Sequence, residues 1–84
     1  MEFTPGALKR GYSREDVEHA IENHIDKFDH QGLLELTILI GPTANGELIE
    51  VGVELDTDGL TILRVAHVMP SRPKYTRTKK PTKR

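Results

Sequence analysis

Apolar residues recur at helical spacing in the segment that follows Ser13. The stripe consists of Val17, Ala20, Ile21 and Ile25. Residues at that spacing share one face of a helix, so this face is expected to turn inward. Ser13 stands where an N-cap would be, and Asp16 occupies the acidic position of a capping box three residues later. The pattern predicts an amphipathic helix from Arg14 to about His24.

Three later segments alternate apolar and polar side chains, which is the period of a strand with one buried face. They span residues 34–40, 49–55 and 60–69. The Asn45-Gly46 pair and the run 56–59 separate them, and both are turn signals. The three segments are therefore expected to pair in chain order as an antiparallel meander.

The third segment alternates imperfectly. Its apolar residues cannot all face one side of a sheet unless the strand has a bulge or both of its faces are buried; they are Ile62, Leu63, Val65 and Val68. The helix must cover one face of the sheet, because a lone sheet has no other way to hide its apolar side. The predicted fold class is α+β: one N-terminal helix packed on a three-stranded antiparallel β-meander. Residues 1–75 are expected to form this single domain and residues 76–84 a disordered basic tail.

Charge is distributed unevenly along the chain. All 13 acidic residues lie at or before Asp58, where only four bases accompany them, whereas the segment from Gly59 onward has eight bases and no acid. The formal net charge of −1 therefore hides a strong separation of charge. A basic surface that ends in a basic tail indicates an anionic partner, either nucleic acid or an acidic protein.

Length and composition restrict the class further. With 84 residues the chain allows one small domain, for which an obligate partner or a homodimer is plausible. The absence of cysteine excludes disulfides, thiolate nucleophiles and cysteine-based zinc sites. His19, His24 and His30 form no recognisable metal-ligand spacing, so neither a metal nor a cofactor is expected. No apolar run is long enough to cross a bilayer and no signal peptide is recognisable, so no membrane association and a cytoplasmic location are expected.

Several short motifs occur in an order that resembles a known group of proteins. They are GYSREDV at 11–17, IG at 40–41, GELIEV at 46–51, and VAHVMP followed by Arg72, Lys74 and Tyr75. In this order the chain resembles the BrnT-type toxins and their actinobacterial relatives, broadly within the RelE/ParE-type toxin superfamily. The resemblance covers Leu8 to Tyr75 and implies a helix on an antiparallel sheet, RNA cleavage in many members, and neutralisation by a cognate antitoxin protein. The chain departs from the BrnT pattern in its short N-terminal strand and in the basic tail that replaces a C-terminal helix.

The chemistry of metal-independent RNA cleavage suggests where a site would lie. It needs a base for the 2′-hydroxyl, a cation for the charge that develops on phosphorus, and an acid for the leaving oxygen. The residues proposed for these catalytic roles are His67, Arg72, Lys74 and Tyr75. The residues proposed for contacts with nucleic acid are Lys9, Arg10, Arg64, Arg77, Lys79 and Lys80.

Each of these residues also has an interpretation without catalysis. His67 can be a sheet histidine with a satisfied hydrogen bond, Tyr75 a packing residue, and the bases a solvated rim. Glu50 and Glu54, which project from one face of the second strand, can act as a pair of carboxylates or pair across the sheet with Arg64, which is the simpler explanation. Two functions therefore remain open: a toxin-like endoribonuclease, and a non-catalytic module that binds nucleic acid or protein.

Overall fold

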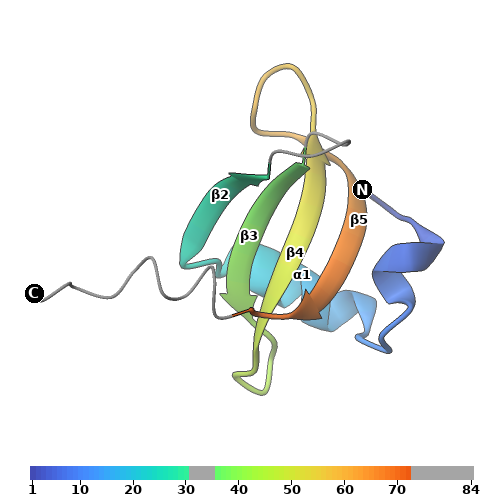
Figure 1. Ribbon diagram of the computed structural model, residues 1–84, viewed down its shortest axis with the longest axis vertical. Helices are drawn as coiled ribbons and strands as arrows, with labels where there is room; N and C mark the ends of the chain where they lie inside the picture. Colours follow the sequence, from blue (N-terminus) through green and yellow to red (C-terminus); the bar gives the residue numbers. More distant parts are fainter. Residues whose placement is uncertain (31–35, 73–84) are drawn as a thin grey trace, which may run out of the picture.

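The computed structural model describes residues 1–30 and 36–72, which form two short helices and a mixed sheet (Figure 1). The sheet has five strands in the order β1-β5-β4-β3-β2. The elements in chain order are β1 (Glu2–Phe3), the 3-10 helix η1 (Pro5–Leu8), α1 (Arg14–Glu22), β2 (Asp26–His30), β3 (Leu36–Pro42), β4 (Leu48–Leu55) and β5 (Ile62–Pro70). Neither helix in the described part of the chain is long and apolar enough to cross a membrane. The expected tail 76–84 lies outside the described residues.

The α+β class and the antiparallel pairing of β3, β4 and β5 agree with the sequence pattern, but the prediction of a three-stranded sheet is wrong. β2 adds an antiparallel strand beside β3, with Asp26 opposite Ile40. β1 pairs in parallel with β5, with Glu2 opposite Arg64. Neither strand has a periodicity to detect, because β1 has two residues and β2 (DKFDH) has a single apolar one. Both are strands only because a neighbouring edge offers unpaired backbone groups.

The helix begins where the sequence predicts and ends earlier. The Ser13 hydroxyl accepts a hydrogen bond from the Asp16 backbone N–H at 3.0 Å, which is the expected N-cap. At the other end Asn23 donates from its backbone and from its side chain to the His19 carbonyl oxygen. Ile25 therefore lies beyond the helix and is 67% exposed, so the prediction that it faces inward is wrong. Its backbone N–H instead donates to the Ile40 carbonyl oxygen at 2.7 Å and leads the chain into β2.

The irregular alternation of β5 has the cause that the sequence suggested. The pairing of β4 with β5 shifts register twice, between Gly52 and Val53 and between Glu54 and Leu55. Each shift leaves one extra residue on β5, so Val65 and Val68 both reach the core although they are three residues apart. Of the two explanations that the sequence left open, a bulge or two buried faces, the register shifts show the bulge.

The two faces of the sheet differ. On one face α1 and η1 cover an apolar core (Figure 1) made of Ala7, Val17, Ala20, Leu39, Ile49, Val51, Val53, Val65 and Val68. On the other face the alternate residues of β3 and β4 are also buried, and they include Ile38, Ile40 and Glu50. β3 and β4 are therefore buried on both sides, which is why a charged residue on β4 needs partners within the protein.

The last turn of α1 lies directly on the backbone of β3. Gly41 makes this approach possible, because a Cβ at that position would collide with the Ala20 carbonyl oxygen and lie 3.0 Å from the His24 Cα. One residue further along β3, the Pro42 carbonyl oxygen is 2.8 Å from His19 Nδ1. Helix and sheet thus meet backbone to backbone at this corner.

The turn between β4 and β5 is organised by Asp58. Its carboxylate accepts hydrogen bonds from the Leu60 and Thr61 backbone N–H groups, at 2.8 and 2.9 Å, and from the Thr61 hydroxyl. The bonds from Thr61 come first among the causes that lower the pKa of Asp58 to about 2. Gly59 completes the turn with φ of 72°, a conformation that glycine adopts without strain.

Replacing Gly41 by alanine is expected to destabilise the protein by about 2 kcal/mol, because the added methyl group forces α1 away from β3. Urea unfolding of both proteins measures the difference. Gly6→Ala is the matched control: its new Cβ would meet no atom closer than 3.7 Å, so a change within about 0.5 kcal/mol is expected. Equal stability of the two variants would contradict the close approach of α1 to β3.

Candidate active site

Glu50 is a charged residue at the centre of the sheet. It belongs to β4, the middle strand of five, and its side chain is fully buried on the face opposite α1. A carboxylate in such a place is costly unless several donors satisfy it. Its partners come from β5 and from the residues immediately after that strand.

Arg72 supplies three of the hydrogen bonds to Glu50. Its Nε donates to Oε1 at 3.1 Å and its Nη2 donates to Oε2 at 2.8 Å, so the guanidinium forks over both carboxylate oxygens. The Arg72 backbone N–H adds a bond to Oε1 at 3.3 Å. The preceding residue is held in turn, since the Ser71 N–H donates to the Leu48 carbonyl oxygen at 3.1 Å. The chain after β5 is thus tied to the centre of the sheet.

His67 supplies the remaining bond, with Nε2 at 3.0 Å from Glu50 Oε2. An ionised carboxylate only accepts, so Nε2 carries the proton and donates. In the neutral ring Nδ1 is then the nitrogen with a free lone pair, and no described residue forms a hydrogen bond with it. The side chain of His67 is 35% exposed, so the ring joins the buried carboxylate to the surface.

Alternation along β5 puts His67 on the face opposite to that of its neighbour Val68, and the bulge lets Val65 face the core as well. His67 therefore lies on the same face as Glu50. A regular strand would have put residues 65 and 67 on the same face. Gly52 lies opposite His67, and a Cβ there would be 3.0 Å from the His67 Cβ, so this glycine makes room for the ring.

The environment keeps Glu50 ionised. Burial, the largest single influence, raises its pKa, but the hydrogen bonds from Arg72 and His67 together with the positive charge of Arg72 outweigh it, so the pKa of Glu50 is lowered. The carboxylate of Glu50 and the guanidinium of Arg72 carry opposite charges that offset each other.

The structure brings together two of the four residues predicted to be catalytic, His67 and Arg72. The other two, Lys74 and Tyr75, lie outside the described residues. Of the predicted contacts with nucleic acid, Arg64 forms an ion pair with Glu54 at 3.5 Å, which confirms the cross-strand pairing suggested for Glu54. Lys9 and Arg10 are exposed after η1. The last three, Arg77, Lys79 and Lys80, also lie outside the described part of the chain.

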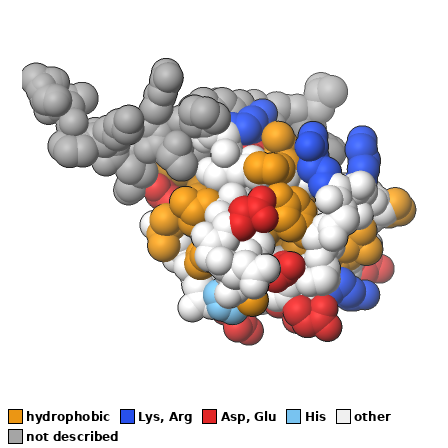
Figure 2. All heavy atoms as spheres, turned by 90° about the horizontal axis from the view of Figure 1, so that it is seen from below, with side chains coloured by type: hydrophobic (Ala, Val, Ile, Leu, Met, Phe, Trp, Pro, Cys, Tyr) orange, Lys and Arg blue, Asp and Glu red, His pale blue; other side chains and the backbone are white. Residues whose placement is uncertain are grey.

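The residue that sequence reasoning assigned wrongly is Glu50. It was expected to pair with Arg64 or to act with Glu54, whereas it binds His67 and Arg72. The available signal was its place inside the apolar run of β4, where an ionised side chain must find partners from other strands. Figure 2 shows the wider setting: in this view Lys and Arg side chains gather mainly toward the upper edge and acidic ones lie mostly below them.

No protein-family profile, curated protein or solved structure that was compared matches the chain. What this site can do must therefore be argued from the arrangement of its side chains. A histidine oriented by a buried carboxylate, with an arginine on the same carboxylate, is an arrangement that suits proton transfer beside an anionic group.

Glu50→Gln is expected to lower the free energy of unfolding by about 2 kcal/mol at pH 7. The carboxylate of Glu50 accepts hydrogen bonds on both oxygens, whereas the amide of glutamine has one accepting oxygen and an NH2 group that only donates, so some of the bonds from Arg72 and His67 are lost. The pKa of Glu50 is lower in the folded state than in the unfolded chain. The stabilisation that the Glu50 carboxylate provides is therefore complete above the pKa of Glu50 in the unfolded chain. It is lost as the pH falls through the pKa of Glu50 in the folded protein. The difference between wild type and variant should be constant above about pH 5 and shrink below about pH 4.

Chemical denaturation across this pH range measures the effect. Glu54→Gln is the control, because its partner Arg64 and Glu54 itself are both about half exposed, and a change within about 0.5 kcal/mol is expected. A deficit in Glu50→Gln that persists undiminished at acid pH would show that the carboxylate charge is not what stabilises this corner.

Proposed function

We propose that the protein is a toxin-like, metal-independent endoribonuclease that acts through His67, Glu50 and Arg72. The observation that supports this function is the orientation of His67: its Nε2 donates to a buried carboxylate at 3.0 Å while the ring is partly exposed. The basic C-terminal half of the chain, with eight bases and no acid, suits a phosphate-rich substrate. RNA would be the substrate and an antitoxin protein the natural inhibitor, as the sequence resemblance implies.

His67 acts as the base in this proposal. Nδ1 takes the proton from a ribose 2′-hydroxyl, and the 2′-oxygen attacks the adjacent phosphorus. The bond from that phosphorus to the 5′-oxygen breaks, which leaves a 2′,3′-cyclic phosphate and a 5′-hydroxyl that receives its proton from solvent water or a nearby acid. Glu50 orients the ring and stabilises the imidazolium that forms.

The charges of the cluster change in the direction that this reaction needs. Before proton transfer, the carboxylate of Glu50 and the guanidinium of Arg72 cancel. The proton taken by His67 leaves the cluster with a net positive charge at the moment when negative charge builds on the phosphorane. The groups that carry this charge are held in position beforehand by their hydrogen bonds to Glu50, so they stabilise the transition state with little reorganisation.

The structural role of Arg72 favours a second function. In this alternative the protein is a non-catalytic module that binds nucleic acid or protein. The guanidinium of Arg72 holds both oxygens of Glu50 and ties the end of β5 to the sheet, which is a structural role that needs no substrate. In that case the basic C-terminal half would contact an anionic partner and His67 would only complete the hydrogen bonds of Glu50.

Induced expression of the wild-type protein in a bacterial host is expected to arrest growth and deplete cellular RNA, whereas His67→Ala and Arg72→Ala should relieve both effects. Growth curves and total RNA from the same cultures give the result, with protein levels measured by immunoblot. Glu54→Gln, on the same face of β4 but outside the cluster, should arrest growth as the wild type does. Sustained growth with intact RNA under the wild-type protein would favour the binding module.

The purified protein is expected to cleave a short RNA in the presence of EDTA and to leave the same sequence uncut when its 2′-hydroxyls are replaced by hydrogen. His67→Ala should lower the cleavage rate at least about 100-fold, the usual contribution of a positioned base. Mass spectrometry of the fragments should find 2′,3′-cyclic phosphate ends. Cleavage of the 2′-deoxy substrate would rule out this mechanism, and so would the loss of RNA cleavage in the presence of EDTA.

A further inference from the structure

An apolar groove lies on the α1 face of the sheet, away from Glu50. It encloses about 220 Å³ between the end of α1, the sheet and the turn from β4 to β5. Its lining is almost entirely aliphatic: Ile21, Leu39, Val53, Leu55, Leu60 and Ile62, with His24 and Lys27 at one side.

The groove exists because α1 is too short to cover the sheet. Its nine residues span roughly 14 Å, whereas the eight residues of β4 span roughly 27 Å. α1 lies behind the lower part of the strands in Figure 1, and the turn from β4 to β5 projects at the opposite end. The apolar residues at that end therefore have no helix above them.

Leu60 shows the consequence most clearly. It lines the groove and yet is 80% exposed, more than any other large apolar residue of the described chain. Leu55 and Ile62 are also only partly buried. Exposed aliphatic side chains around a hollow are typical of a surface that a partner covers.

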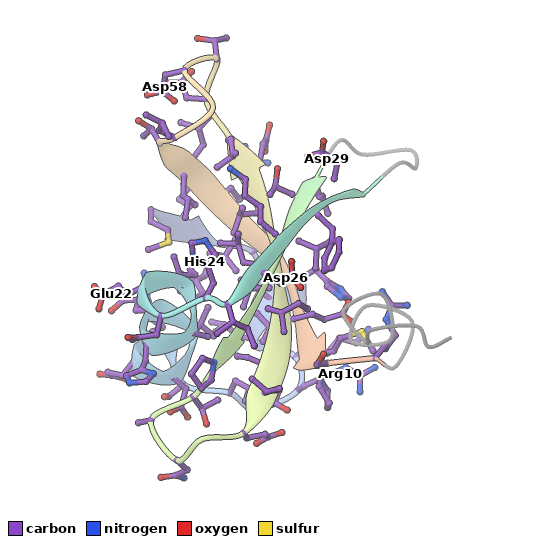
Figure 3. All side chains as sticks on the ribbon, turned by 90° about the vertical axis from the view of Figure 1, so that its left-hand side faces the viewer. Arg10, Glu22, His24, Asp26, Asp29 and Asp58 are labelled. Atoms are coloured by element: carbon purple, nitrogen blue, oxygen red, sulfur yellow. The ribbon has the colours of Figure 1, made fainter. Side chains whose placement is uncertain are left out.

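Acidic residues flank this surface at the end of α1 and in the turn from β4 to β5. Glu22 is the last residue of α1, and Asp56 and Asp58 belong to the turn from β4 to β5, whereas Glu50 and Glu54 project from the opposite face of the sheet. Figure 3 shows two of the acids on opposite sides of the region, with Glu22 at the end of α1 and Asp58 at the tip of the turn. An apolar hollow with acids at two of its ends complements apolar side chains that are flanked by positive charge.

We infer that this groove binds a short amphipathic segment of a partner protein, with aliphatic residues on one face and Lys or Arg beside them. The volume is below the range of about 300–1,000 Å³ typical of sites for small molecules, and it suits one or two inserted side chains. Helical segments commonly bind in this way, with anchors spaced three or four residues apart. The segment binds the face opposite Glu50, so it leaves the proposed catalytic cluster open, and the inference does not depend on the ribonuclease proposal.

A fluorescein-labelled peptide of leucine and lysine, about 14 residues long and amphipathic as a helix, tests the inference by fluorescence anisotropy against the full chain. The wild-type protein is expected to bind it, to bind a scrambled peptide of equal composition about tenfold more weakly, and not to bind the version with glutamate in place of lysine. Leu60→Ser should weaken binding about tenfold, because the anchor loses its apolar contact. Glu22→Gln should weaken peptide binding less than Leu60→Ser does, and it should reduce the dependence of the peptide affinity on salt.

Leu63→Ser is the matched control, since Leu63 is 44% exposed but does not line the groove, and binding within about twofold of wild type is expected. His67→Ala should also bind normally, so failure of the ribonuclease proposal stays separate from failure of this one. Equal binding of the scrambled peptide, or no effect of Leu60→Ser, would overturn the inference. So would a dimer in sedimentation that Leu60→Ser dissociates, because the occupant would then be a second copy of the chain.

Discussion

A single buried carboxylate determines much of this structure. Glu50 lies in the central strand without contact to water, and its negative charge is tolerated only because Arg72 and His67 donate to both of its oxygens. Those donors come from the end of β5 and from the residues just after it, so satisfying one charge also fixes how the chain leaves the sheet. The features that stabilise this corner of the fold and the features that make it chemically interesting are the same hydrogen bonds.

The geometry of β5 makes that cluster possible. In a regular strand with Val68 in the core, Val65 would lie on the same face as His67, away from the core. The extra residue at the bulge lets Val65 and Val68 both pack against the core and leaves His67 beside Glu50. Gly52 contributes the space, because a Cβ there would lie only 3.0 Å from the His67 Cβ. A local irregularity in backbone pairing thus lets β5 contribute both to the core and to the partners of Glu50.

The two faces of the sheet suit different tasks. The face with Glu50 joins a buried charge to a partly exposed histidine, whereas the face with α1 combines the core with an apolar groove that α1 is too short to fill. The acidic residues belong to the part of the chain that forms the sheet and the helix, and the bases dominate after Gly59. These two regions of the sequence thus carry opposite net charge.

Local signals in the sequence determined most elements of the fold. Ser13 marked the start of α1, turn residues separated β3, β4 and β5, and the broken alternation around Val65 left a bulge as one of two explanations. These features arise from residues close together in the chain, so a pattern can reveal them. The strands β1 and β2 could not be predicted in this way, because they form only where the edges of an existing sheet offer unpaired backbone groups. His67 and Arg72 could be proposed from their chemistry, but their meeting at Glu50, 17 and 22 residues away, depends on strand register, on the bulge and on the turn after β5. A buried charge must be paired, and only the tertiary structure decides which donors reach it.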